Sequence, residues 1–129
     1  MAQYADIIEI IAPSEAQSGS RVDITVRIKN THSAAIGIMV GGALEHGVSP
    51  WPGITFPNSS ANVNAGATYS FTGYFTMPDK KVTIHAYSYW YGADSAWHFD
   101  DEMTKVVNLA EVVASQFGSI EIVSYERRL

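Results

Sequence analysis

The chain of 129 residues contains no cysteine. This absence excludes a disulfide framework and a zinc site built on thiolates, so stability must come from packing alone. A chain of this length is expected to form one compact domain that buries about two thirds of its unfolded surface.

Positive charge is also scarce. Eight Lys and Arg residues stand against thirteen Asp and Glu residues, which gives a formal net charge of −5. The basic residues are scattered at Arg21, Arg27, Lys29, Lys80, Lys81, Lys105, Arg127 and Arg128. Because phosphate binding needs a clustered positive field, nucleic acid is not an expected partner.

Long apolar runs are missing as well. The start of the chain, Met1 to Asp6, has neither the basic nor the apolar region of a signal peptide, so we expect no signal peptide in this chain. The apolar stretches are far shorter than a bilayer span, and no membrane insertion is expected.

What the sequence does contain is alternation. In the run from Arg21 to Asn30 every second residue is Val or Ile, with polar side chains between them. This period of two predicts a strand with one buried face and one face in water. Similar segments at close spacing, separated by turn residues, are typical of an all-β sandwich.

The remaining strands are predicted from the same pattern. The segments are Ile7 to Ile11, Ala34 to Val40, Ile54 to Phe56, Thr68 to Met77, Lys81 to Trp90 and Ala96 to Leu109. Gly41-Gly42 is expected to halt the third of the long strands, with Ala43-Leu44 as a possible continuation. Glu45 to Asn64 otherwise reads as a long irregular crossover, a kind of loop that often carries function.

The order of these features resembles a known family. Pro13 and Gly19 precede the alternating strand, which ends in Asn30-Thr31; Ala65-Gly66 precedes an aromatic strand, and Met77-Pro78-Asp79-Lys80-Lys81 precedes the next. This arrangement resembles the bacterial and archaeal immunoglobulin-like modules of the cell-adhesion-related (CARDB-like) type, over Ile7 to about Leu109. It implies an immunoglobulin-like β-sandwich of seven or eight antiparallel strands spanning residues 1–109.

Residues 110–129 are predicted to be a linker, with a short helix possible over Ala110 to Phe117, and an additional C-terminal strand. Ile120-Glu121-Ile122-Val123 echoes Ile8-Glu9-Ile10-Ile11, and Gly118-Ser119 precedes it as a joint. The strand could add to its own sheet, pair with a neighbouring subunit, or remain a tail. Pairing between subunits would use the unpaired edge of a sheet as a template. The assembly strand is then Ile120, Glu121, Ile122, Val123, Ser124 and Tyr125.

No group of residues points to chemistry. The acidic run Asp100-Asp101-Glu102 lacks the spacing of a calcium loop, so a solvated strand segment is favoured over a cation site. His32 and His46 stand apart, while His85 and His98 could meet across the last hairpin as a surface pair. Nucleophile elbows and phosphate-binding glycine loops are missing from the sequence, so neither an enzyme nor a cofactor is expected.

The aromatic residues are the strongest indication of binding. Alternation over Lys81 to Trp90 predicts an inner face formed by Val82, Ile84, Ala86 and Ser88, which turns the tyrosines of the hairpin outward. Three tryptophans, Trp51, Trp90 and Trp97, lie near loops. These rings could stack on sugar rings or anchor a protein. The alternative is that they stabilise the hairpin through cross-strand pairs. The predicted contact surface is Trp51, Tyr87, Tyr89, Tyr91 and Trp97.

These features together favour a non-enzymatic structural or interaction module that self-assembles. The most specific expectation is a virion component, such as a capsid decoration or minor coat protein, whose partners are copies of itself and a capsid or other assembly protein. The alternative is a carbohydrate- or protein-binding module of a secreted or cell-surface protein. The expected location is accordingly the virion, or the extracellular space or cell surface.

Overall fold

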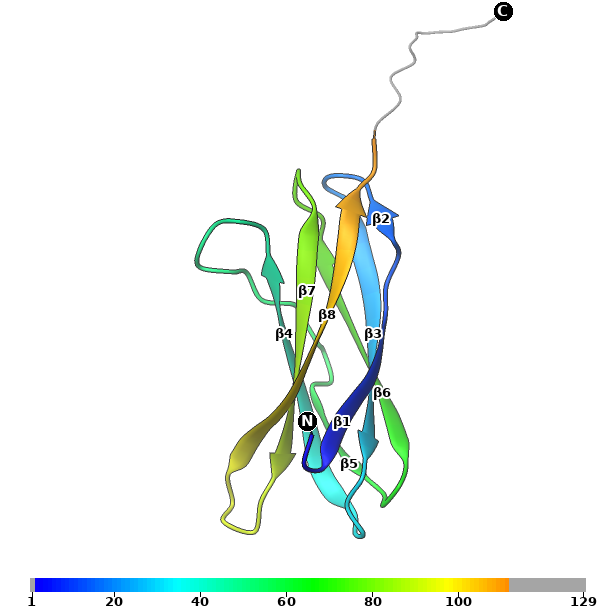
Figure 1. Cartoon of the computed structure of the whole chain (residues 1–129), viewed down its shortest axis with the longest axis vertical. Helices are drawn as coiled ribbons and strands as arrows, with labels where there is room; N and C mark the ends of the chain where they lie inside the picture. Colours follow the sequence, from blue (N-terminus) through cyan, green and yellow to red (C-terminus); the bar gives the residue numbers. More distant parts are fainter. Residues whose placement is uncertain (1, 112–129) are drawn as a thin grey trace, which may run out of the picture.

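A computed structural model describes residues 2–111 as two β-sheets packed face to face (Figure 1). Eight strands follow one another within these described residues: β1 (Ala5–Ile11), β2 (Glu15–Ala16), β3 (Arg21–Asn30), β4 (Ile36–Glu45), β5 (Ser60–Val63), β6 (Thr68–Thr76), β7 (Val82–Tyr91) and β8 (Trp97–Leu109). Within the described residues, no helix is long and apolar enough to cross a membrane.

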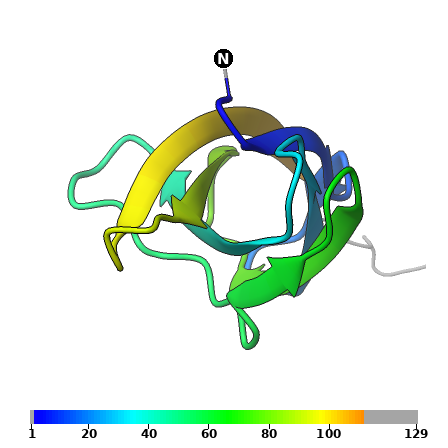
Figure 2. The ribbon, with the colours of Figure 1, turned by 90° about the horizontal axis from the view of Figure 1, so that it is seen from below.

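The smaller sheet has the order β1-β3-β6 and the larger one the order β2-β8-β7-β4-β5. Figure 2 shows the two layers curving around a common core, with β1 lying beside β8. The predicted all-β sandwich is therefore confirmed. One detail differs, because the two-residue strand β2 pairs with β8 in parallel rather than antiparallel.

Alternation in β3 produces the core. Val22, Ile24, Val26 and Ile28 are at most 2% exposed, and they belong to the same core cluster as the inward apolar side chains of β7 from the other sheet. Burying each such side chain stabilises the fold by roughly 1.5–3 kcal/mol. The predicted inner face of the hairpin, Val82, Ile84, Ala86 and Ser88, is likewise buried.

The prediction that Gly41-Gly42 halts a strand over Ala34 to Val40 is wrong, and the alternative that Ala43-Leu44 continues this strand is confirmed. The strand β4 continues through both glycines to Glu45. A Cβ atom at Gly42 would lie 2.9 Å from Cδ1 of Ile54 and 3.2 Å from the carbonyl oxygen of His85. Gly42 is therefore needed because the crossover segment with Ile54 packs closely against it. The backbone of β4 remains extended at this position.

The crossover predicted over Glu45 to Asn64 links the two sheets. Gly53 bridges to Ala43 of β4 and Thr55 bridges to Tyr74 of β6, so the segment predicted as a strand over Ile54 to Phe56 forms only isolated bridges. The chain then returns to the larger sheet as β5, an edge strand that the sequence pattern did not reveal. Its four residues are too few for a visible period of two.

The strand β8 ends at Leu109. The predicted helix over Ala110 to Phe117 falls almost wholly, and the assembly strand Ile120 to Tyr125 falls entirely, outside the described residues. Both stay predictions.

Candidate functional site: the aromatic face of the five-stranded sheet

The outer face of β7 carries the predicted tyrosines. Because successive side chains of a strand point to opposite faces, the buried series from Val82 to Ser88 leaves His85, Tyr87 and Tyr89 on the outer surface. Tyr91, at the end of the strand, is 44% exposed.

A continuous row of rings runs along this face. The ring of Trp51, from the crossover, stacks on His85 with centroids 4.8 Å apart, and His85 stacks on Tyr87 at 6.4 Å. Phe99 of β8 lies 6.2 Å from Tyr87 and 5.8 Å from Tyr89. These five residues, Trp51, His85, Tyr87, Phe99 and Tyr89, are called the aromatic row below.

Phe99 is the residue of the row that the sequence prediction missed. It is 58% exposed, more than any other large hydrophobic side chain among the described residues. It lies opposite Tyr89 in the β7–β8 ladder, just where the register shifts between Ser88 and Tyr89. Phe99 lies two residues after Trp97, a spacing that places both side chains on the same face of a regular strand. The bulge that sets the position of Phe99, however, is not visible in the sequence.

The neighbouring strand β4 carries small outer residues opposite the row. Gly41 pairs with Tyr87, and Ala43 pairs with His85. A Cβ atom at Gly41 would lie 3.6 Å from Cε1 of Tyr89. His85 and Tyr87 therefore lie beside small residues of β4, while Tyr89 lies opposite Met39.

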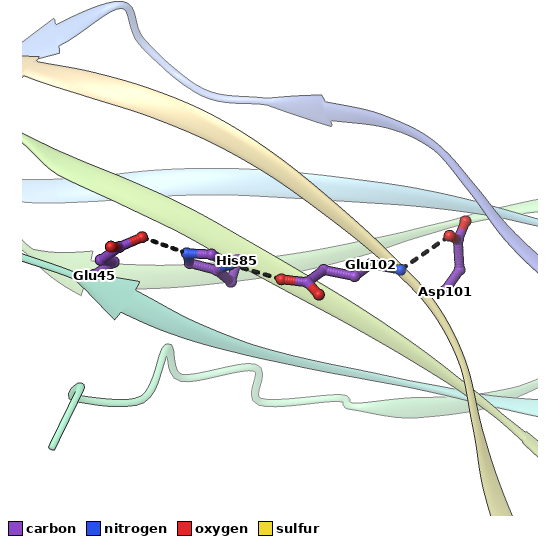
Figure 3. Close-up of polar contacts among 4 residues, drawn as sticks. All are labelled: Glu45, His85, Asp101 and Glu102. Atoms are coloured by element: carbon purple, nitrogen blue, oxygen red, sulfur yellow. Dashed lines mark hydrogen bonds and ion pairs between the residues drawn. The ribbon is translucent and has the colours of Figure 1, made fainter. Parts of the chain in front are cut away.

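His85 is held between two carboxylates (Figure 3). Its Nδ1 lies 2.7 Å from Oε2 of Glu102, and its Nε2 lies 2.8 Å from Oε1 of Glu45. A neutral imidazole has only one N–H, so both contacts together fit the imidazolium form. Burial acts to lower the pKa of His85, but hydrogen bonds and charge from Glu102 and Glu45 outweigh it and raise the pKa.

The same two carboxylates affect the next ring in the row. Burial raises the pKa of the Tyr87 hydroxyl, and the negative charges of Glu102 and Glu45 add to this effect. The phenol therefore stays protonated and remains a hydrogen-bond donor to a partner.

The acidic run has a different role from the predicted solvated segment. The carboxylate of Asp100 accepts hydrogen bonds from the backbone N–H groups of Tyr4 and Ala5, and that of Asp101 accepts from Ile7 at 3.0 Å. These contacts join β8 to the edge of β1. Only Glu102 faces outward, toward His85.

The predicted meeting of His85 and His98 does not occur. His85 lies opposite Thr104, whereas His98 lies opposite Trp90, farther along the hairpin. The ring of His98 stacks on Trp90 at 4.5 Å. Its Nε2 contacts Asp94 at 2.9 Å, and this hydrogen bond lowers the pKa of that carboxyl.

Trp97 and Tyr91 form a separate pair at the end of the sheet. Their rings meet edge to face with centroids 5.1 Å apart. The structure thus brings Trp51, Tyr87 and Tyr89 together in the row and keeps Tyr91 and Trp97 apart from it. Within residues 2–111, no three His, Asp or Glu side chains are arranged to hold a metal ion.

Comparisons with known proteins show the fold. No family model matches the chain, and no curated protein matches it. Among solved structures, the CARDB domain of the PF1109 protein from Pyrococcus furiosus, solved with di-metal ions, has a TM-score of 0.57 at 12% identity, covering 85% of this chain and 92% of that one. The putative ApaA protein from Bordetella pertussis has a TM-score of 0.60 at 13% identity, covering 87% and 100%.

A third similar structure is part of an enzyme. The alkylpurine DNA glycosylase of Pseudomonas fluorescens matches with a TM-score of 0.57 at 12% identity, over 81% of this chain but only 30% of the enzyme. This chain therefore corresponds to under a third of that protein. At such identities the likeness shows the fold alone, an immunoglobulin-like, CARDB-like β-sandwich, and the function has to be argued from the surface.

Proposed function

We propose that this chain is a non-enzymatic interaction module that self-associates through the aromatic row. The observation that carries the proposal is the exposure of aromatic side chains on the outer face of the five-stranded sheet, with Phe99 at 58% and Trp51 at 40%. Sheets pack face to face in many proteins, and exposed apolar patches of this kind mark protein contacts.

Charge at the two ends of β7 supports a second copy as the partner. Lys80 and Lys81 precede the strand, and Asp94 follows it in the turn to β8. A two-fold axis that lies in the contact plane and runs perpendicular to β7 would place the lysine end of one copy against the Asp94 end of the other. Isologous contacts of this kind are the commonest in homo-oligomers.

Within this role we propose a structural component of a larger assembly, such as a capsid decoration or minor coat protein of a virion. The echo between residues 120–123 and residues 8–11 supports it, because a copy of the first strand could add to a neighbouring subunit. The same module on a cell surface would use the same contacts.

The test is the oligomeric state of the full chain by sedimentation equilibrium. Wild type is expected to form dimers or larger species, and Phe99→Ser to shift the population to monomer. Ile8→Ser is the matched control: Ile8 is 39% exposed on β1 of the other sheet, so this change should leave association unchanged. Ile122→Pro separately tests the terminal strand. A monomeric wild type, or a Phe99→Ser variant that associates normally, would contradict the proposal.

A second candidate function, carbohydrate binding, is favoured by a different observation. The pair formed by Tyr91 and Trp97 borders a hollow beside the edge strand β5.

A further inference from the structure

A hollow of about 350 Å³ lies at the edge of the five-stranded sheet, where β5, β4 and the end of the β7–β8 hairpin meet. Six residues line it: Gly37, Ser60, Ala61, Asn62, Tyr91 and Trp97. This set is called the edge hollow. Its volume lies at the lower end of the range for small-molecule sites, which suits one or two sugar rings.

Gly37 allows the tryptophan to reach across the sheet. Trp97 starts on β8 and pairs with Tyr91 of β7, yet its Cη2 lies 3.5 Å from where a Cβ atom of Gly37 on β4 would stand. The indole thus spans the hairpin and ends over the bare backbone of β4. Trp97 remains 39% exposed, so one side of this arrangement is open to a ligand.

The lining has the chemistry of a site for neutral, hydroxylated ligands. The two rings offer apolar surface to the C–H face of a sugar, while the Ser60 hydroxyl and the Asn62 amide can both donate and accept hydrogen bonds. Among the described residues, no charged side chain lines the hollow. A charged ligand would find no counter-ion there and would lose hydration on entry.

The edge position adds further hydrogen-bonding groups. Because β5 is the last strand of its sheet within residues 2–111, the backbone groups on its outer side have no neighbouring strand in that part of the chain. Sugar hydroxyl groups can pair with such N–H and C=O groups as well as with the Asn62 side chain.

We infer that the edge hollow is a binding site for a neutral carbohydrate, with the Tyr91–Trp97 pair as the stacking surface and Ser60 and Asn62 as the hydroxyl partners. This inference goes beyond self-association and does not rest on it, since Phe99 and the rest of the aromatic row lie outside the hollow. The competing occupants are an extended peptide on β5 and a second copy of the chain.

The experiment titrates the full chain with maltohexaose, cellohexaose, xylohexaose and mannohexaose, with hexagalacturonate as the charged control. Binding of at least one neutral oligosaccharide is expected by calorimetry, with a shift of the Trp97 indole N–H resonance in NMR spectra. Trp97→Ala should weaken the affinity about tenfold or more. Tyr69→Ala is the matched control, because Tyr69 is 40% exposed but lies on β6 of the other sheet.

Asn62→Ala provides a second variant that removes a hydrogen-bonding group without removing a ring. It should weaken binding of the same oligosaccharide while leaving the fold unchanged. The inference is overturned if no neutral sugar shifts the Trp97 resonance, if Trp97→Ala binds like wild type, or if hexagalacturonate binds equally well. Loss of self-association in Trp97→Ala without any sugar binding would assign the hollow to the contact between copies.

Discussion

The backbone N–H of Ala5 donates a hydrogen bond to Oδ2 of Asp100 at 2.6 Å, which ties the first strand of one sheet to the last strand of the other. The same carboxylate accepts from Tyr4 at 2.8 Å and from Gln3 at 2.5 Å. Backbone donors at the edge of β1 are thereby occupied by a side chain. An edge blocked in this way is a poor template for another strand.

Asp100→Ala is expected to destabilise the sandwich by about 3 kcal/mol, because three N–H groups lose a charged acceptor and Ala5 is fully buried. Asp100→Asn should cost less, since one oxygen remains to accept. Unfolding in urea measures both. Asp23→Asn is the matched control: its side chain is 75% exposed, so a change within about 0.5 kcal/mol is expected. Equal effects at the two positions would refute the anchoring role.

Asn30 explains why the alternating strand ends in Asn-Thr. It is fully buried, and its Nδ2 donates to the carbonyl oxygens of Ala34 and Val63, each at 2.9 Å. Its Oδ1 accepts from the N–H of His32 at 2.8 Å. The side chain therefore joins the end of β3 to the following turn and to β5.

Asn30→Ala should cost about 3 kcal/mol of unfolding free energy, since it leaves buried carbonyl groups without donors. Asn30→Asp should be comparably harmful because a carboxylate cannot donate. The control is Asn58→Ala in the exposed crossover. Thermal unfolding followed by circular dichroism distinguishes them, and similar midpoints for Asn30→Ala and Asn58→Ala would exclude this role.

The fold could be predicted from the alternation of apolar and polar residues, because this pattern depends only on residues that are neighbours in the chain. Val22 to Ile28 and Val82 to Ser88 were placed correctly on their buried faces for this reason. The roles of the polar residues depend on register and on contacts between sheets, which a single sequence does not specify. Asp100 and Ala5, for example, are 95 positions apart.

In the candidate site too, local features could be predicted from the sequence and contacts between strands could not. The outward tyrosines follow from the period of two, but the position of His85 between Glu45 and Glu102 requires the mutual register of β4, β7 and β8. The bulge beside Tyr89 likewise brings Phe99 into the aromatic row without any mark in the local pattern. The sequence could therefore suggest individual site residues on β4, β7 and β8, but it could not predict which of them contact one another.

Gly73 leaves space on β6 that the crossover fills. A Cβ atom there would lie 2.6 Å from Cδ1 of Phe56 and 2.8 Å from the carbonyl oxygen of Thr55. Since the backbone oxygen cannot move aside, Gly73→Ala should destabilise the protein by about 2 kcal/mol. Gly53→Ala is the control, because its nearest neighbour would be 3.8 Å away. Chemical denaturation compares the two, and a stable Gly73→Ala variant would show that the crossover is not packed there.

The contact of His85 with two carboxylates predicts a dependence of stability on pH. Glu102 and Glu45 favour the imidazolium in the folded state, so its folded pKa is above the unfolded value of about 6.5. The stabilisation is therefore fully present below that value and is lost as the pH rises through the folded pKa. The ring is largely buried but both carboxylates are partly exposed, so a loss of about 1 kcal/mol is expected for the two pairs.

The measurement is the free energy of unfolding in urea from a pH of about 6 to about 9, a range that covers the titration of a histidine. Wild type should become less stable across this range, and His85→Gln should lose that slope. His46→Gln is the control, because the ring of His46 makes no hydrogen bond within the part of the chain that is described. Neutralisation of His85 also breaks one of its two carboxylate contacts, which should loosen the stacked Trp51 and shift its indole resonance over the same pH range. A slope that persists in His85→Gln would assign the pH dependence to other groups and leave His85 a packing residue beneath Trp51.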